Sequence, residues 1–112
     1  MPNTITTIKG WAFYNCTSLK SINFPEGLLY IGGNNDYVMQ SYAFNGCTSL
    51  TQIDLPHSLL GIGGNSFKGC TNISSINYNG TIEEWSNVYK GSGWASGVAT
   101  TVVHCTDGDV NI

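Results

Sequence analysis

The chain has 112 residues and a net charge of −3, and only 10% of its residues are charged, against roughly a quarter in an average soluble protein. Its length predicts a single domain. Four lysines without any arginine cannot form the basic patch that nucleic-acid binding requires, so we expect no nucleic-acid partner. No apolar run approaches the ~20 residues of a membrane helix, and residues 1–20 lack the pattern of a signal peptide, so we expect no membrane insertion.

One sequence pattern occurs three times along the chain. The pattern F-x-x-C-T-x-(L/I)-x-x-I-x-(F/L/Y) begins at the second residue of the segments Ala12–Pro25, Ala43–Pro56 and Ser66–Asn79. A short unit repeated in this way predicts a solenoid, in which each repeat packs on its neighbours. Ile-x-Gly triplets that precede each copy give a period of 23, with a middle copy that is longer by eight residues. We place these extra residues near 34–41.

Each repeat contains one strand and one return leg. Ile53 and Leu55 alternate with the polar Gln52 and Asp54, and this period of two is typical of a half-buried strand. The apolar residues of the return leg Ile62–Cys70 have a spacing that suits a short helix or a helical turn packed behind the strand. Stacked repeats therefore predict an α/β solenoid with a parallel strand layer on one side and short helical back legs on the other.

The pattern L-x-x-I-x-(I/L)-P … I-G-x-x-(A/S)-F-x-x-C-x-x-L resembles the BspA-like leucine-rich repeats, which occur in bacterial and protist surface proteins. The resemblance covers residues 2–79. The sequence departs from the family pattern at the insertion and at Ser66, where the other copies have alanine. It implies a right-handed solenoid of two to three coils at 1–79. Residues 80–112 are similar to the C-terminal cap of such arrays. The resemblance also implies a cell-surface or secreted location and a role in adhesion.

The tail can be interpreted from its own residues. Thr81-x-x-Glu84 is a capping box that starts a helix, and Gly91 is expected to end that helix. Thr101–Cys105 is β-branched and predicts a strand, which returns as a hairpin through a turn at Asp107-Gly108. We therefore expect a helix and a hairpin to cover the last coil.

The four cysteines do not indicate a catalytic or metal site. Cys16, Cys47 and Cys70 are equivalent in successive repeats and should stack near the core as small apolar side chains. No C-x-x-C motif is present, which disfavours zinc, and parallel Cβ vectors disfavour disulfides, although both alternatives stay open. His104 and Cys105 are neighbours on a strand and should point to opposite faces. We expect no cofactor and no enzymatic activity.

Two surfaces are candidates for binding. Insertions in repeats map to loops that often bind, and the inserted loop offers Tyr37, Val38 and Met39, which could instead fill a local core. The other surface is the exposed face of the strand layer, whose polar side chains could instead be merely solvated. Its residues are Ser21, Asn23, Gln52, Asp54, Ser75 and Asn77.

These features favour non-catalytic protein binding, with a host or neighbouring-cell surface protein as the partner. The first alternative is a carbohydrate-binding module that uses Trp11, Tyr37, Trp85 or Trp94 as stacking platforms. The second is a structural end-piece of a longer array. A homodimer through the apolar edge of the first coil, near Ile5, is a further expectation.

Overall fold

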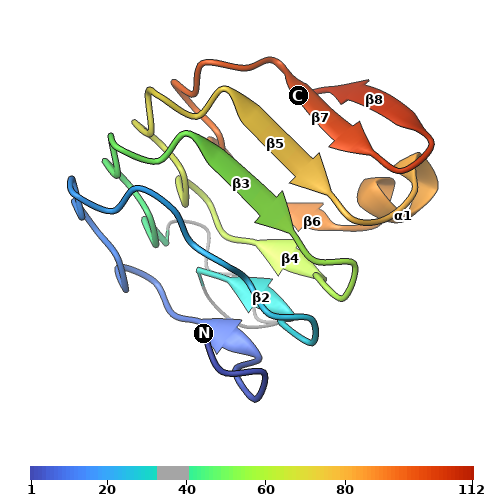
Figure 1. Cartoon of the computed structure of the whole chain (residues 1–112), viewed down its shortest axis with the longest axis horizontal. Helices are drawn as coiled ribbons and strands as arrows, with labels where there is room; N and C mark the ends of the chain where they lie inside the picture. The colour runs from blue at the N-terminus through green and yellow to red at the C-terminus, as the bar shows by residue number, and fades with distance from the viewer. Residues whose placement is uncertain (33–40) are drawn as a thin grey trace.

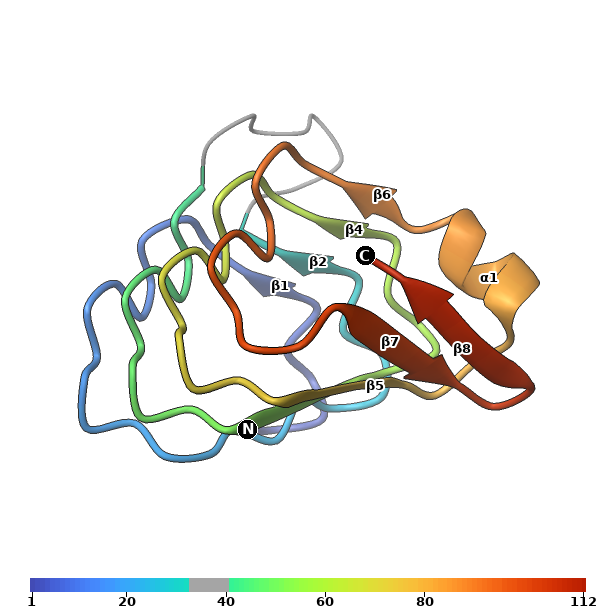
Figure 2. The ribbon, with the colours of Figure 1, turned by 90° about the horizontal axis from the view of Figure 1, so that it is seen from above.

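The computed structural model describes residues 1–32 and 41–112. The chain winds into a solenoid of about four turns, rather than the predicted two to three, and places one sheet on each of two sides (Figures 1 and 2). The predicted insertion, including Tyr37, Val38 and Met39, lies outside the described residues apart from Ser41. Within the described ranges no helix has the length and hydropathy of a membrane span.

The front sheet has the order β3-β5-β7-β8. Its first three strands are parallel, which confirms the predicted parallel strand layer, and β8 is antiparallel to β7. These strands are β3 (Gln52–Leu55), β5 (Ser75–Tyr78), β7 (Val102–Cys105) and β8 (Gly108–Asn111). The back sheet is wholly parallel, in the order β1-β2-β4-β6. Its two-residue strands are β1 (Thr7–Ile8), β2 (Tyr30–Ile31), β4 (Gly61–Ile62) and β6 (Tyr89–Lys90).

The core is a column of equivalent side chains from successive turns. Phe44 lies between Phe13 and Phe67, with ring centroids 4.9 and 5.1 Å away and nearly parallel planes. Phe44 and Phe67 are fully buried, whereas Phe13 in the first turn is half-buried. In the front sheet, Ile53 pairs with Ile76, and both point into this core. The repeat period therefore becomes a stack of identical contacts.

Within the described residues, the back legs contain turns rather than the short helices that were one predicted form. Each leg is a short strand followed by a turn that an i→i−3 hydrogen bond closes, such as Cys70 N–H to the Phe67 carbonyl at 3.2 Å. Equivalent residues in three turns, Asn15, Gly46 and Gly69, have positive φ, which interrupts a right-handed helix. The free backbone N–H groups donate to the next coil instead, since Phe67 N–H reaches the Trp94 carbonyl at 2.8 Å.

The tail continues the solenoid. The helix α1 (Ile82–Ser86) has the predicted capping box, but it ends at the C-cap Asn87 rather than at Gly91. The chain then enters β6 and β7, which pair with β4 and β5 of the preceding turn. Residues 89–105 thus form a fourth turn, and the predicted hairpin β7–β8 is present at its end. The predicted domain boundary between residues 79 and 80 stays a prediction.

Candidate functional site

The front sheet presents a row of polar side chains, which we call the front face: Gln52, Asp54, Ser75, Asn77 and His104. The register places Asp54 beside Asn77 and Asn77 beside His104 on successive strands. Side chains two residues apart on a strand point to the same side, so Gln52 and Asp54 share this face, and both are exposed. The repeat thus converts a sequence period into one continuous polar surface.

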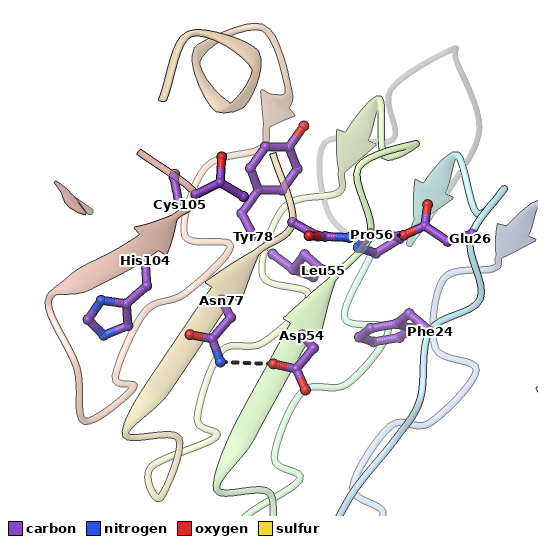
Figure 3. Close-up of a pocket in the computed structure, with 11 residues that line it drawn as sticks. Phe24, Glu26, Asp54, Leu55, Pro56, Asn77, Tyr78, His104 and Cys105 are labelled. Carbon is purple, nitrogen blue, oxygen red and sulfur yellow. Dashed lines mark hydrogen bonds between the residues drawn. The ribbon is translucent and has the colours of Figure 1, made fainter. Parts of the chain in front are cut away.

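Asp54 is the centre of the hydrogen bonds on the front face. Its Oδ1 accepts from Asn77 Nδ2 at 2.8 Å, as Figure 3 shows. Gln52 Nε2 donates to both carboxylate oxygens, at 3.0 Å for Oδ1 and 3.1 Å for Oδ2. All three bonds come from neutral amides, which fix the direction of the carboxylate and leave its negative charge in place.

A pocket of about 450 Å³ opens where the front strands end. We call it the front pocket (Figure 3). Its walls come from three successive strands and from the end of the first repeat. The half-buried Phe24 supplies apolar surface, while Glu26, Asp54 and His104 supply ionisable groups. The Glu26 carboxylate accepts a long hydrogen bond from Asn79 Nδ2 at 3.5 Å. None of the residues that line this pocket in the described part of the chain is a lysine.

His104 has its own partner across the hairpin. His104 Nδ1 lies 2.8 Å from Asp109 Oδ1, because β7 and β8 place these residues opposite each other. Cys105, the next residue, is half-buried, and burial is the main cause that raises the pKa of its thiol, followed by the charges of Asp107 and Asp109. A raised pKa disfavours the reactive thiolate, so the pKa gives no support to a thiol nucleophile at this pair.

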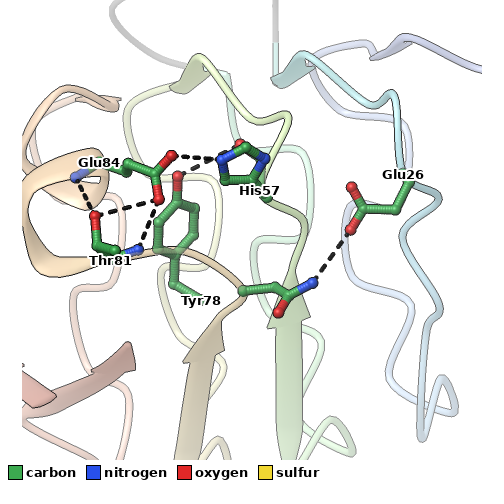
Figure 4. Close-up of polar contacts among 6 residues, drawn as sticks. Glu26, His57, Tyr78, Thr81 and Glu84 are labelled. Atoms are coloured by element: carbon green, nitrogen blue, oxygen red, sulfur yellow. Dashed lines mark hydrogen bonds and ion pairs between the residues drawn. The ribbon is translucent and has the colours of Figure 1, made fainter. Parts of the chain in front are cut away.

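A second polar cluster joins the second turn to α1 (Figure 4). Glu84 accepts from the backbone N–H of Thr81 at 2.9 Å and lies 2.5 Å from His57 Nε2. The hydroxyl of Tyr78 donates to the His57 carbonyl at 3.5 Å. His57 is exposed, yet it pairs with Glu84 across 27 positions of sequence. Nothing in the local sequence around His57 signals this partner.

The hydrogen bonds to Glu84 give a pH-dependent prediction. The Thr81 backbone N–H, followed by His57, lowers the pKa of Glu84 below its ordinary value of 4.5. A carboxylate whose pKa is lower in the folded state stabilises the fold above the unfolded-state pKa, and this contribution disappears as pH falls through the folded pKa. We expect Glu84→Gln to lower the melting temperature at pH 7, and this difference from the wild type to disappear as pH falls through the folded-state pKa. Glu83→Gln, on the same helix, is the control, and equal effects of both variants at pH 7 would contradict this role.

The predicted sheet-face residues lie on or beside the front sheet, and their role in binding stays a prediction. Gln52 and Asp54 are exposed, Ser75 and Asn77 are half-buried, and all four lie on the front sheet. Ser21 and Asn23 are exposed but belong to no strand. Phe24 and His104, which also line the pocket, were not among the predicted residues, whereas Glu26 was expected to flank the face. Recognition of 89–105 as a further turn would have added His104, because it aligns with Asn77.

The fold and the repeat agree with a comparison to known families. The model of the BspA type leucine-rich repeat region matches residues 1–86, with six copies. The chain belongs to the BspA-type leucine-rich-repeat family. No curated protein and no solved structure matches the chain. Leucine-rich-repeat solenoids are in general binding scaffolds that use extended surfaces for recognition, so the chain is a repeat module suited to protein interaction.

The cysteines of these BspA-type repeats belong to the packing of the solenoid. All four are free thiols. Cys47 and Cys70 are buried and donate from Sγ to the carbonyls of Phe13 and Phe44 in the preceding turn, at 3.1 and 3.0 Å. Burial is the main cause that raises the pKa of Cys70 to about 12. In the described residues, no group of three His, Cys, Asp or Glu side chains could hold a metal ion.

Aromatic residues are exposed at one place on the BspA-type repeats and buried at another. Trp85 and Trp94 are only 4% and 7% exposed, which removes them as the sugar-stacking platforms that we considered. Trp11 is 56% exposed and lies 4.9 Å from Tyr14 and 4.6 Å from Tyr42, between ring centroids. We call these three residues the aromatic patch; the sequence singled out Trp11 alone.

Proposed function

We propose that this chain is a non-catalytic protein-binding module of a cell-surface or secreted protein, in which it serves adhesion to host proteins or neighbouring cells. The observation that carries the proposal is the alignment of Asp54, Asn77 and His104 on three parallel strands beside the front pocket. Amide and hydroxyl side chains adapt their hydrogen bonds to another protein surface, and a concave pocket can anchor one projecting side chain. The location and the adhesive role rest on the family.

The test is binding of the chain to a panel of extracellular-matrix and plasma proteins, measured by biolayer interferometry. We expect Asp54→Lys to weaken the binding of a captured protein by about tenfold or more, because it reverses the charge at the centre of the front face. Glu83→Lys changes the net charge equally, on α1 and away from that face, so it should bind like the wild type. Absence of binding to the whole panel, or equal losses in both variants, would contradict the proposal.

The aromatic patch supports a second candidate function, carbohydrate binding. Trp11 in the first turn and Tyr42 in the second have φ of 66° and 51°. The equivalent residue of the third turn is Asn65, with φ of 59°. Bulky residues rarely adopt this left-handed conformation, whereas asparagine adopts it readily, so two aromatic residues are held there at an energetic cost. Such strain is often retained at functional sites, and exposed flat rings are suited to stacking on the apolar face of a sugar.

A glycan array tests this second function. We expect Trp11→Ala to abolish the glycan signal, because it removes the ring that contacts both tyrosines. Leu60→Ala removes another large exposed side chain outside the patch, 51% exposed, and should keep the signal. A wild-type chain that binds no glycan would eliminate carbohydrate binding as a function of the patch.

A further inference from the structure

We infer that the front pocket receives a lysine side chain of the protein partner, an inference that rests on the proposed function. The front pocket is defined by walls from four successive turns, and its volume of about 450 Å³ lies in the lower part of the range of about 300–1,000 Å³ found for ligand pockets. That space exceeds what one amino-acid side chain fills, so a side chain can enter with its hydration or with neighbouring residues.

The charge of the front pocket favours a cation. Asp54 and Glu26 both line it, and the hydrogen bonds that orient them come from the neutral amides of Gln52, Asn77 and Asn79. The ion pairs found among the described residues join other groups, His57 to Glu84 and His104 to Asp109. An incoming ammonium group would therefore find two carboxylates whose charge is still uncompensated.

The lysines of the chain itself do not supply this charge. Lys90 donates from Nζ to the carbonyls of Trp85 and Val88, at 2.8 and 2.7 Å, and lies over the Trp85 ring. The remaining lysines are absent from the described residues that line the pocket. The complementary charge must therefore come from another molecule, and in a protein-binding module that molecule is the partner.

The apolar walls favour a long aliphatic stem. The half-buried ring of Phe24 lines the same pocket as the two carboxylates, whereas Leu55 is almost fully buried beneath it (Figure 3). Lysine and arginine bury their methylene stems on apolar surface while the charged group reaches a polar partner. A small inorganic cation would leave this apolar surface uncovered, and a neutral side chain would leave both carboxylates without a partner.

The hydrogen bonds already made by Asp54 favour lysine over arginine. A carboxylate offers about four acceptor positions, and Gln52 and Asn77 occupy two on Oδ1 and one on Oδ2. A paired guanidinium fork would need a free position on each oxygen, so it would have to displace Gln52. An ammonium group needs only the remaining position on Oδ2, and Glu26 adds a second negative charge to the lining of the same pocket.

The experiment titrates the isotope-labelled full chain with the blocked peptide Gly-Gly-Lys-Gly-Gly and follows backbone amide shifts by NMR. We expect saturable shifts at Asp54, Asn77 and His104, about tenfold weaker affinity in Asp54→Asn and in Glu26→Gln, and unchanged affinity in Glu83→Gln. The shifts should weaken as the salt concentration rises from about 0.05 to about 0.5 M, because an exposed ion pair is screened. Peptides with arginine or glutamine in place of lysine should bind more weakly, in that order.

Other outcomes separate this inference from the proposed function. If a protein from the panel binds and is lost in Asp54→Lys but retained in both Asp54→Asn and Glu26→Gln, the front face binds protein without a lysine in the pocket, and the inference is overturned. If the lysine peptide binds as expected while no panel protein does, the pocket chemistry stands and the adhesive function fails. Peptide shifts that are absent, or spread over all acidic residues, overturn the inference.

Discussion

Phe44→Ala should destabilise the fold by about 3–5 kcal/mol, the range typical of a fully buried phenylalanine replaced by alanine. Phe44 has no exposed surface and packs face to face between Phe13 and Phe67, and the nearly perpendicular Phe24 ring lies 5.7 Å away between centroids. The substitution would open a cavity between three successive turns, and neighbouring turns cannot close it without breaking their backbone hydrogen bonds.

Urea unfolding, followed by tryptophan fluorescence, measures this loss as a change in the free energy of unfolding. Leu60→Ala is the matched control, because Leu60 is a large apolar residue that is 51% exposed, and we expect it to change stability by less than about 0.5 kcal/mol. A loss below about 1 kcal/mol in Phe44→Ala would show that the aromatic column is not the core of the solenoid.

Gly91→Ala should have the second-largest effect, with a loss of about 1–3 kcal/mol or more. A Cβ at Gly91 would lie 2.3 Å from the backbone nitrogen of Gly64 and 2.7 Å from its Cα. These atoms belong to the backbone of the preceding turn, so they cannot move aside as a flexible side chain would. The third and fourth turns must separate, and the hydrogen bond from Gly91 N–H to the Ile62 carbonyl, 2.8 Å long, must lengthen.

The same unfolding measurement, with Ser92→Ala as a control at the exposed neighbouring position, tests the contact at Gly91. We expect the control to unfold like the wild type. If Gly91→Ala also unfolds like the wild type, the close approach of the third and fourth turns is wrong, and residues 89–105 do not pack as a turn of the solenoid.

The front strands could be predicted because their alternation is local. Ile53 and Leu55 point inward and Gln52 and Asp54 outward, as a period of two requires. The capping box at Thr81 was equally local, because its donor and acceptor lie three residues apart. Features that depend on a few neighbouring residues were therefore accessible from the sequence.

Short helices were expected in the back legs because apolar spacing was given more weight than turn chemistry. Asn15, Gly46 and Gly69 were visible in the sequence, and asparagine and glycine are the residues that best tolerate positive φ. Their left-handed conformation interrupts each helical turn and directs the backbone to the next coil. The recurrence of Asn or Gly two residues after each phenylalanine was the signal against a helix.

The fourth turn, which contributes His104 and Cys105 to the front pocket, could not be predicted from the repeat. Residues 89–105 do not contain the F-x-x-C segment of the pattern. Their pairing with the third turn is set by backbone register, as between Val103 and Ile76. This register alone places His104 beside Asn77 on the front face. Glu26 follows the repeat's proline in a turn, where no period assigns a direction to its side chain.

The central claim is that the front face contacts the partner, and site-specific photo-crosslinking tests it most directly. The crosslinking residue p-benzoylphenylalanine would replace Gln52, which is exposed on β3, and in a separate chain Lys68, which is exposed on a back leg. With a protein captured from the panel, we predict a covalent adduct from position 52 and none from position 68. An adduct from position 68 without one from position 52 would contradict the account, because the partner would then bind the back of the solenoid.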